Sequence, residues 1–470
     1  MIFGKKQQLL DEHVLQYTTP GTEGECELTI GFDFGTSATK VVIQAPFIPG
    51  SPSYAVDFGA LGHESMPSLL PTVISLDEDG ICSLGSIKGG QRVNDIKIEL
   101  LSKTDDMSSR LGPTHQNLSP EAVAVTYSAL LLRYAREWFL TEKRALIEHF
   151  SEFRWSLNLG VPSPSIERNA ENVRFQRVGK AGWMLSLLSQ DKISIRRALV
   201  ELGQVDDPSY WDEDDSTLCE FAIVPEIVGG AVGYALSDVR REGLHIIVDV
   251  GASTVDVCTF SLHKPDGSDR YSLLTADVQL LGTLRLHLHR IKALNATILD
   301  QSERLRDSHD PLAPLALDLD PYLIPESTFR EYLVDAERKL LKDFQYMLRK
   351  VIMDLKWKRD PNSPIWREGS LSIILIGGGS KLRFFREAVE DLNGWMRETV
   401  CPLGFRFIPL DFPESFKTET ADFHRLSVAW GLSHRAIEVG EVTPADQIRD
   451  IDISSEKVDW ADRYISKDQV

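Results

Sequence analysis

Apolar and polar positions alternate in several short segments of this chain, a pattern that predicts β-strands. The clearest segment is residues 28–33, where an apolar run ends at Asp33, and the pattern resumes over residues 40–43. A run over residues 371–376, LSIILI, is apolar except for Ser372 and is typical of a strand buried on both faces. Shorter strands are predicted over residues 72–75, 81–84, 155–161, 271–281 and 405–409.

Longer segments carry apolar residues at three- and four-residue steps, which predicts amphipathic helices. One begins at Pro120, directly after Ser119, and extends to residue 150, and another covers residues 329–357. A third begins at Pro225-Glu226 and is rich in glycine and alanine, so its backbone can approach its neighbours closely. Further helices are predicted over residues 193–202, 283–299 and 425–439 and from residue 382.

The turn after the first strand has the composition of a phosphate-binding turn. Asp33 ends the strand, Gly35 allows a tight turn, and Thr36 and Ser37 offer hydroxyl and N–H donors. On its own this is a weak signal, because a polar hairpin turn has the same composition and needs no ligand.

The same pattern returns in residues 246–260, IIVDVGASTVDVCTF. There Asp249, Gly251 and Thr254 repeat the arrangement of the first turn. A repeat at this separation indicates two similar lobes, each ending a strand with an aspartate and a glycine turn.

A third turn follows the apolar strand over residues 371–376. It contains Gly377, Gly378 and Gly379, then Ser380 and Lys381 before the next helix. Glycines at this place let the backbone approach a flat or anionic ligand, and the helix N-terminus adds a favourable field. An ordinary connection from strand to helix is the alternative, although three consecutive glycines exceed what such a connection requires.

Two single charged residues can serve a site between these turns. Lys97 lies among alternating apolar residues and can place its amine in a cleft, although most single lysines are simply solvated. Glu226 stands at the start of a helix, where a carboxylate can face a cleft. The alternative for Glu226 is a favourable charge at the positive end of the helix dipole.

The composition is that of a globular protein, with 470 residues, 42% hydrophobic and 26% charged. Its formal charge of −19 argues against nucleic-acid or membrane binding over the whole surface. Five scattered cysteines without C-x-x-C spacing are expected to be reduced core thiols. No segment approaches the roughly 20 apolar residues that span a bilayer, so we expect a cytoplasmic protein.

Taken together and in order, these motifs resemble those of the actin-like ATPase superfamily, and within it the nucleotide-binding domain of the seventy-kilodalton heat-shock chaperones. The resemblance implies an α/β fold of the ribonuclease H type with two lobes. Each lobe would be a mixed five-stranded sheet flanked by helices, with the nucleotide cleft between them. The matching segments, within residues 24–438, are IGFDFGTSATKVVI, LNLGVP, PEIVGGAVGYAL, IIVDVGASTVDVCTF, ILIGGGSKL and SVAWGLSHRA.

The resemblance also implies domain boundaries. We expect a flexible leader, two lobes, a closing helix that returns to the first lobe, and an acidic tail, with an insertion inside lobe I. A peptide-binding domain is not expected after the closing helix, so chaperoning of peptides by this chain alone is not expected. The predicted ranges are 1–23 for the leader, 24–241 for lobe I, 163–224 for its insertion, 242–419 for lobe II, 420–439 for the closing helix and 440–470 for the tail.

The family resemblance assigns a role to each candidate residue around ATP or ADP and Mg²⁺. Asp33 and Asp249 would hold the magnesium through its water shell, and Lys97 would reach the γ-phosphate. Glu226 and Asp256 would position the attacking water. The remaining assignments are Gly35, Thr36, Ser37, Gly251 and Thr254 to the phosphates, Gly377, Gly378, Gly379 and Lys381 to the adenosine, and Glu337 to the ribose.

The chain departs from the family pattern at two of these places. The second phosphate turn carries Ala252 and Ser253 where the chaperones have glycines, which can slow or reshape hydrolysis. The lysine that usually accompanies the ribose glutamate falls on Leu340, which weakens the assignment of Glu337.

The expected function is that of a slow ATPase whose nucleotide state is transmitted to a protein partner or co-chaperone. A filament-forming scaffold of the same superfamily, which would self-associate, is the first alternative. A sugar or small-molecule kinase is the second, although the chain carries no kinase-specific motif.

Overall fold

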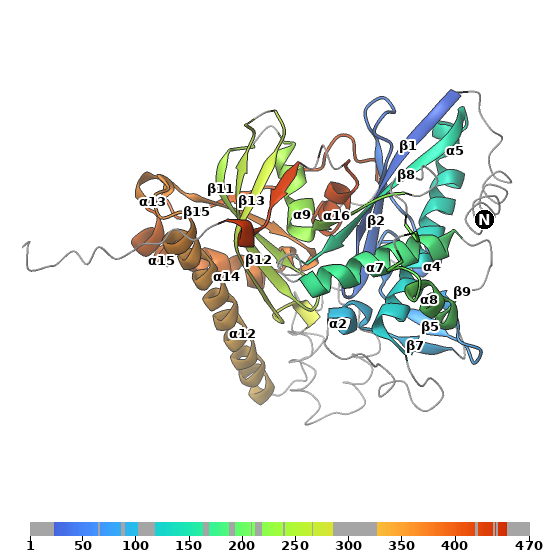
Figure 1. Ribbon diagram of the computed structural model, residues 1–470. Helices are drawn as coiled ribbons and strands as arrows, with labels where there is room; N and C mark the ends of the chain where they lie inside the picture. The colour runs from blue at the N-terminus through green and yellow to red at the C-terminus, as the bar shows by residue number, and fades with distance from the viewer. Residues whose placement is uncertain are drawn as a thin grey trace, which may run out of the picture.

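The computed structural model describes residues 23–448 with gaps at 64–65, 86–89, 102–117, 163–168, 188–192, 208, 212–218, 238–239, 266, 285–326, 419–421, 436–437 and 439. The predicted leader, the greater part of the predicted helix over 283–299 and the tail from residue 449 lie outside the described residues. The described chain is an α/β protein with mixed sheets flanked by helices (Figure 1).

The first large sheet is built around β1 (Glu23–Asp33). This strand pairs antiparallel with β2 (Ala38–Gln44) and parallel with β8 (Phe150–Val161). The strands that complete the sheet are β3 (Ser53–Ala55) and β4 (Leu70–Pro71) beside β2, and β10 (Glu220–Pro225) beside β8.

The second large sheet is built around a hairpin of β11 (Gly243–Val250) and β12 (Val255–His263). The strand β14 (Leu371–Ile376) pairs parallel with β11 and has the predicted bounds. The strands that complete this sheet are β13 (Arg270–Gln279), β15 (Phe405–Ile408) and β16 (Glu441–Thr443).

A smaller third sheet shares the core of the first large sheet, and helices cover the two large sheets. In the described residues the small sheet contains β5 (Ile74–Leu76), β6 (Ile81–Leu84), β7 (Gln91–Val93) and β9 (Ile193–Ser194). The main helices are α2 (Ile96–Leu101), α4 (Pro120–Glu142), α5 (Arg144–Ile147), α7 (Asn169–Ser186), α8 (Ile195–Leu202), α9 (Glu226–Ala235), α12 (Ser327–Asp354), α13 (Ile365–Glu368), α14 (Arg383–Asp391), α15 (Asn393–Trp395) and α16 (Phe423–Leu432).

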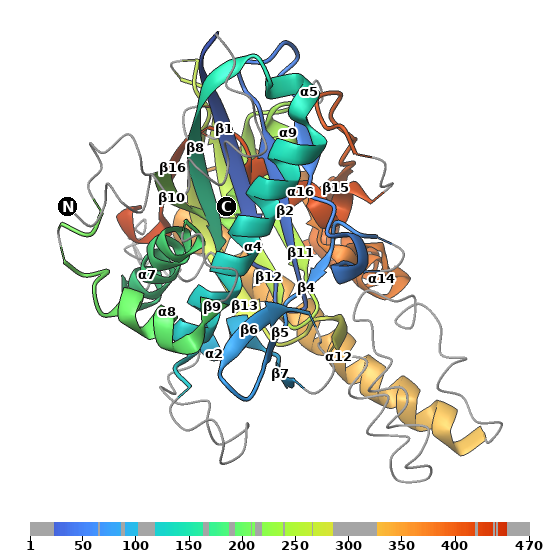
Figure 2. The same cartoon turned by 90° about the vertical axis from the view of Figure 1, so that its right-hand side faces the viewer.

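Two of the helices, α9 and α16, lie between the large sheets (Figure 1). The helix α16 contacts β1, β2 and β8 of the first sheet and β14 of the second, and α9 contacts β8 and β11. The outer face of the first sheet packs on α4 and α7, and the outer face of the second packs on α12 and α14 (Figures 1 and 2).

The alternation in β1 explains which face the site uses. Leu28, Ile30 and Phe32 share one face of the strand and are buried in the core with α4. Gly31 and Asp33 therefore belong to the inner face, toward α16. A Cβ at Gly31 would lie 2.1 Å from the carbonyl oxygen of a residue in α16, so only glycine allows this approach.

The two inner helices cross with their backbones in contact. A Cβ at Gly431 of α16 would lie 1.9 Å from the carbonyl oxygen of Gly229 in α9. The neighbouring Trp430 donates from Nε1 to Ser53 Oγ at 2.9 Å, which ties α16 to the first sheet. The glycines that weaken these helices in isolation are therefore the residues that let them meet.

The observed architecture differs from the predicted one in the number of strands. Each large sheet has six strands in the described residues, not five. The additional pairings include β16, which falls in the predicted tail and is tied to β13 by an ion pair between Glu441 and Arg270. The strand β10 falls, except for its last residue, in the range predicted as an insertion. It is nevertheless part of the first sheet, because it pairs with β8.

One predicted helix ends earlier than expected. The predicted span to residue 150 consists of α4 and the short α5, and β8 already begins at Phe150. The reason is long-range pairing, since β8 follows β1 in parallel from Glu23 onward. The first residues of β8 are recruited by a distant strand that local periodicity does not reveal.

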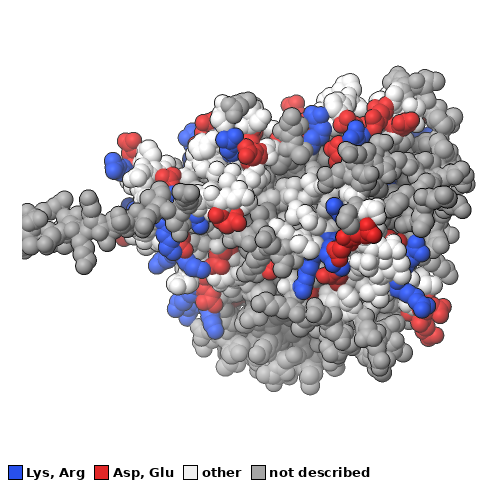
Figure 3. All heavy atoms as spheres, viewed as in Figure 1, with Lys and Arg blue, Asp and Glu red and all other residues white. Residues whose placement is uncertain are grey.

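All five cysteines are free and buried, as predicted. No helix among the described residues is long and apolar enough to cross a membrane. On the face shown in Figure 3, the described Lys and Arg side chains are interspersed with Asp and Glu side chains.

Candidate functional site

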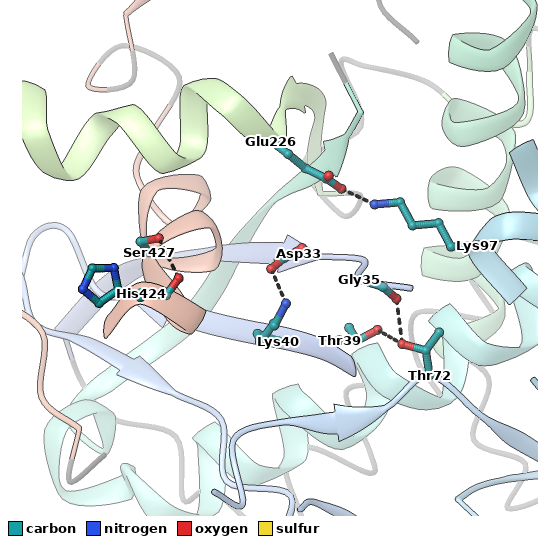
Figure 4. Close-up of polar contacts among 9 residues, drawn as sticks. All are labelled: Asp33, Gly35, Thr39, Lys40, Thr72, Lys97, Glu226, His424 and Ser427. Carbon is teal, nitrogen blue, oxygen red and sulfur yellow. Dashed lines mark hydrogen bonds and ion pairs between the residues drawn. The ribbon is translucent and has the colours of Figure 1, made fainter. Parts of the chain in front are cut away.

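The first hairpin places a cation opposite its aspartate. In the pairing of β1 with β2, Asp33 stands directly opposite Lys40. Lys40 Nζ donates to Asp33 Oδ2 at 2.9 Å (Figure 4), and Asp33 is buried. Lys40 belongs to the inner face of β2, because it alternates with Val41 and Ile43 of the outer core.

The turn of this hairpin is held from one side by Thr72. The Thr72 N–H donates to the Ser37 carbonyl at 2.9 Å, and Thr72 Oγ1 donates to the Gly35 carbonyl at 2.7 Å (Figure 4). In a trans peptide the N–H points opposite to the C=O of the same unit. The N–H groups of Thr36 and Ala38 therefore face away from Thr72, as donors for an anion.

The second hairpin repeats this geometry with the opposite charge. Asp249 stands opposite Asp256 in the pairing of β11 with β12. Burial raises the pKa of Asp249 to about 7, and the negative charges of Glu226 and Asp33 add to the effect. Burial, followed by the charges of Asp249 and Glu226, raises the pKa of Asp256 to about 8.

The turn of the second hairpin is also held from one side. The backbone N–H groups of residues 282–284 donate to the three carbonyls of residues 251–253, at 2.6–3.1 Å. We call residues 282–284 the strap. By the same peptide geometry, the N–H groups of residues 252–254 face away from this strap. Three successive N–H groups on one side of a turn form a concave donor surface of the kind that binds anions.

A buried ion pair lies between the two hairpins. Lys97 Nζ, on α2, is 2.6 Å from Glu226 Oε1, at the first residue of α9, and both residues are buried (Figure 4). Burial opposes protonation of Lys97, but the charges of Glu226, Asp33 and Asp256 outweigh it and raise the pKa of the amine. Burial and the charge of Asp33 raise the pKa of Glu226, against the effect of Lys97.

These electrostatic interactions show that five predicted residues come together: Asp33, Lys97, Glu226, Asp249 and Asp256. With Lys40 the cluster has four carboxyl groups and two amines, which leaves two negative charges uncompensated when all are ionised. A hydrated Mg²⁺ fits this donor set, since it prefers oxygen and keeps several waters. Within the described residues no three His, Cys, Asp or Glu side chains are grouped so that they could hold a metal ion directly.

The third glycine turn packs against the second hairpin. Gly377 has a φ of +81°, and a Cβ there would lie 2.2 Å from Asp249 Oδ1. A Cβ at Gly379 would lie 2.4 Å from a methyl group of Val250. The absence of side chains thus brings the end of β14 against the end of β11, beside the Asp249 carboxylate.

The residues assigned to adenosine and ribose are less closely joined to the cluster. Lys381 follows Gly378 and Gly379 in a short 3₁₀ turn, is half-exposed, and pairs with Asp422 at 2.9 Å. Glu337 lies on α12, and Leu340 on the same helix is buried in the core beneath the second sheet. The position at which the chaperones that the sequence resembles carry a lysine is therefore used here for packing.

Two residues of the site were missed from the sequence. Lys40 could have been found from hairpin register, because a strand pair closed at the Asp33 turn puts these two residues opposite each other. Thr72 was assigned to a strand, but it lies before β5 and its hydroxyl and N–H hold the first turn. Lys97, predicted among alternating apolar residues, is on the short helix α2.

No protein-family model matches this chain, and no curated protein matches it significantly.

Proposed function

We propose that this chain binds a nucleotide with Mg²⁺ between its two large sheets and acts as a slow ATPase of the actin-like type, whose nucleotide state switches its shape for a protein partner. The observation that carries the proposal is the pair of aspartate hairpins on the inner faces of the sheets. Each presents backbone N–H donors beside a buried carboxylate. Donors for phosphate and carboxylates for a hydrated cation are what a metal-bound polyphosphate requires.

The arrangement of the sheets supports a two-lobed unit. Each large sheet with its outer helices would form one lobe, and α9 and α16, which contact both sheets, would join the lobes. Nucleotide between the hairpins would contact both lobes at once, so its binding would favour the closed arrangement. Release of the terminal phosphate would remove part of that contact.

The charged residues divide into three tasks under this proposal. Asp33 and Asp249 would hold the waters of Mg²⁺, and the bound ion would offset the negative charge of the phosphates. Lys40 and Lys97 would supply positive charge to the phosphates, each after exchanging a carboxylate partner for a phosphate oxygen. Glu226 and Asp256 would orient the water that attacks the terminal phosphate.

Calorimetric titration of the full chain with ATP and with ADP, with and without magnesium, tests this proposal. We expect magnesium-dependent binding below the millimolar range, and Asp249→Asn should weaken it by about tenfold or more, because one carboxylate no longer attracts the hydrated ion. Asp391→Asn on α14 is a matched control, since Asp391 is exposed. Absence of binding of both nucleotides to the unaltered chain would exclude the proposal.

A further inference from the structure

The second hairpin turn contains a buried hydroxyl without a partner. Ser253 is 6% exposed, and its Oγ forms no hydrogen bond with any described residue. The backbone carbonyl of Ser253 is occupied by the Gly282 N–H at 3.1 Å, so the turn is fixed in position. A buried polar group that is left unpaired costs free energy, and a ligand that accepts a hydrogen bond from Ser253 Oγ would remove this cost.

A carboxylate oxygen of the same hairpin is also buried without a hydrogen-bond partner. Asp256 Oδ1 is buried and has no hydrogen-bond partner among the described residues, whereas the carboxyl group as a whole accepts a hydrogen bond from the Thr254 side chain. The hydroxyl can donate a hydrogen bond and a carboxylate oxygen can accept one, so the two atoms suit ligand groups of different kinds. Beside Ser253 the N–H groups of residues 252–254 add further donors on the side away from the strap.

We propose that Ser253 donates its hydroxyl hydrogen bond to the terminal phosphate of the bound nucleotide and so makes this turn specific for the triphosphate over the diphosphate. The inference rests on the proposed function. The donors of the turn suit a phosphate oxygen, and Asp256 Oδ1 suits a water molecule, because an ionised phosphate oxygen has no proton to give. Within a nucleoside triphosphate, the terminal phosphate is the one that receives an attacking water, which places it at this turn.

The first hairpin sharpens the assignment. Ser37 holds the position in the first turn that Ser253 holds in the second, two residues after the glycine. Ser37 is half-buried, whereas Ser253 is almost fully buried, so only the second hydroxyl depends on a ligand for a partner. The second turn therefore contributes a side-chain contact to selectivity that the first does not need to supply.

The test compares ATP and ADP affinities of Ser253→Ala with those of the unaltered chain, by calorimetry with magnesium. We expect Ser253→Ala to weaken ATP binding about tenfold and to leave ADP binding within about twofold, because a hydrogen bond to a charged group is lost only for the triphosphate. Ser253→Thr, which keeps the hydroxyl, should retain the preference for ATP.

Ser261→Ala is the matched control. Ser261 lies on β12 in the same hairpin, but its Oγ already shares a hydrogen bond with His263 Nε2. Thermal unfolding of each variant shows whether a loss of affinity comes from a loss of folded structure or from the loss of the proposed hydrogen bond to the phosphate. Equal ATP affinity in Ser253→Ala and the unaltered chain, or an equal loss for both nucleotides, would overturn the inference while leaving nucleotide binding intact. Failure of the unaltered chain to bind either nucleotide would instead overturn the proposed function, and the inference with it.

Discussion

The two hairpins at the centre of this molecule share one geometry and differ in charge. The same number of positions separates Asp33 from Lys40 and Asp249 from Asp256, and in both sheets the two residues stand directly opposite each other. The first hairpin compensates its own carboxylate with an amine at 2.9 Å. The second brings two carboxyl groups together, and burial raises the pKa of each.

This difference shows that a repeated backbone motif does not carry a repeated electrostatic role. The second hairpin requires positive charge from elsewhere. Lys97 lies on α2, which packs in the core of the first sheet, and the charges of Glu226, Asp33 and Asp256 all raise the pKa of its amine. The second hairpin is therefore suited to receive a cation, while the first is stable without one.

Removing the shared amine should have the largest effect. Lys97→Met leaves Glu226 buried without its partner, and we expect a loss of about 3–5 kcal/mol in the free energy of unfolding, measured with denaturant in the absence of nucleotide. Adding Glu226→Gln should restore part of this loss, because the buried charge is also removed.

Lys350→Met serves as the control, since Lys350 is half-exposed and pairs with Asp277 at 3.2 Å. We expect a change below about 1 kcal/mol there. Similar losses for Lys97→Met and Lys350→Met would show that the two hairpins do not depend on the buried amine.

A second contrast lies four residues before each aspartate, where β1 has buried Thr29 and β11 has buried His245. His245 Nδ1 donates to the Gly243 carbonyl at 2.8 Å, so in the neutral ring Nε2 accepts from Tyr234 Oη at 3.0 Å. Burial lowers the pKa of His245 from its usual 6.5 to about 4, and the positive charges of Arg240 and His263 act in the same direction.

The unfolded chain therefore binds one proton more than the folded chain between these two pKa values. The contribution of His245 to the free energy of unfolding therefore has its full value above pH 6.5. It decreases by about 3 kcal/mol in total as the pH falls from 6.5 to 4. We expect the free energy of unfolding of His245→Gln to fall less steeply than that of the unaltered chain over this window. Parallel pH profiles for the two proteins would contradict the assignment.

The smallest expected effect comes from replacing the glycine of each hairpin turn with alanine. A Cβ at Gly35 would lie 2.1 Å from the Ala38 carbonyl oxygen, but a Cβ at Gly251 would have no neighbour closer than 3.2 Å. We expect Gly35→Ala to lower the free energy of unfolding by about 2 kcal/mol and Gly251→Ala by less than about 1 kcal/mol. Equal losses on denaturant unfolding would show that the first turn is no tighter than the second.

The sequence allowed prediction of the strands and turns that depend on local pattern. The bounds of β14 agree because its run of apolar residues is flanked by polar and glycine residues, and β6 agrees with its predicted range. The aspartates at the ends of β1 and in β11 were also placed correctly, since an apolar run ending in Asp and Gly is visible in the chain itself.

The parts that could not be predicted depend on contacts between distant segments. The early start of β8 follows from its pairing with β1, and β16 has only three residues to signal a strand. The contact of Gly229 with Gly431 joins the inner helices, yet glycine in a helix gives a local signal of weakness. The positions of Lys97 and Glu226 at 2.6 Å likewise arise only when α2 and α9 are assembled.

The position of α16 also governs the order in which the fold can be completed during synthesis. Its Trp430 bonds to Ser53, 377 positions earlier in the chain. At about 5–20 residues per second, the ribosome needs on the order of 20–80 s to make the intervening chain. Throughout that interval α16 has not been made, so the inner face of the first sheet, with Gly31 and Val42, is not yet covered by it. The earliest strands of this protein are therefore among the last to be buried.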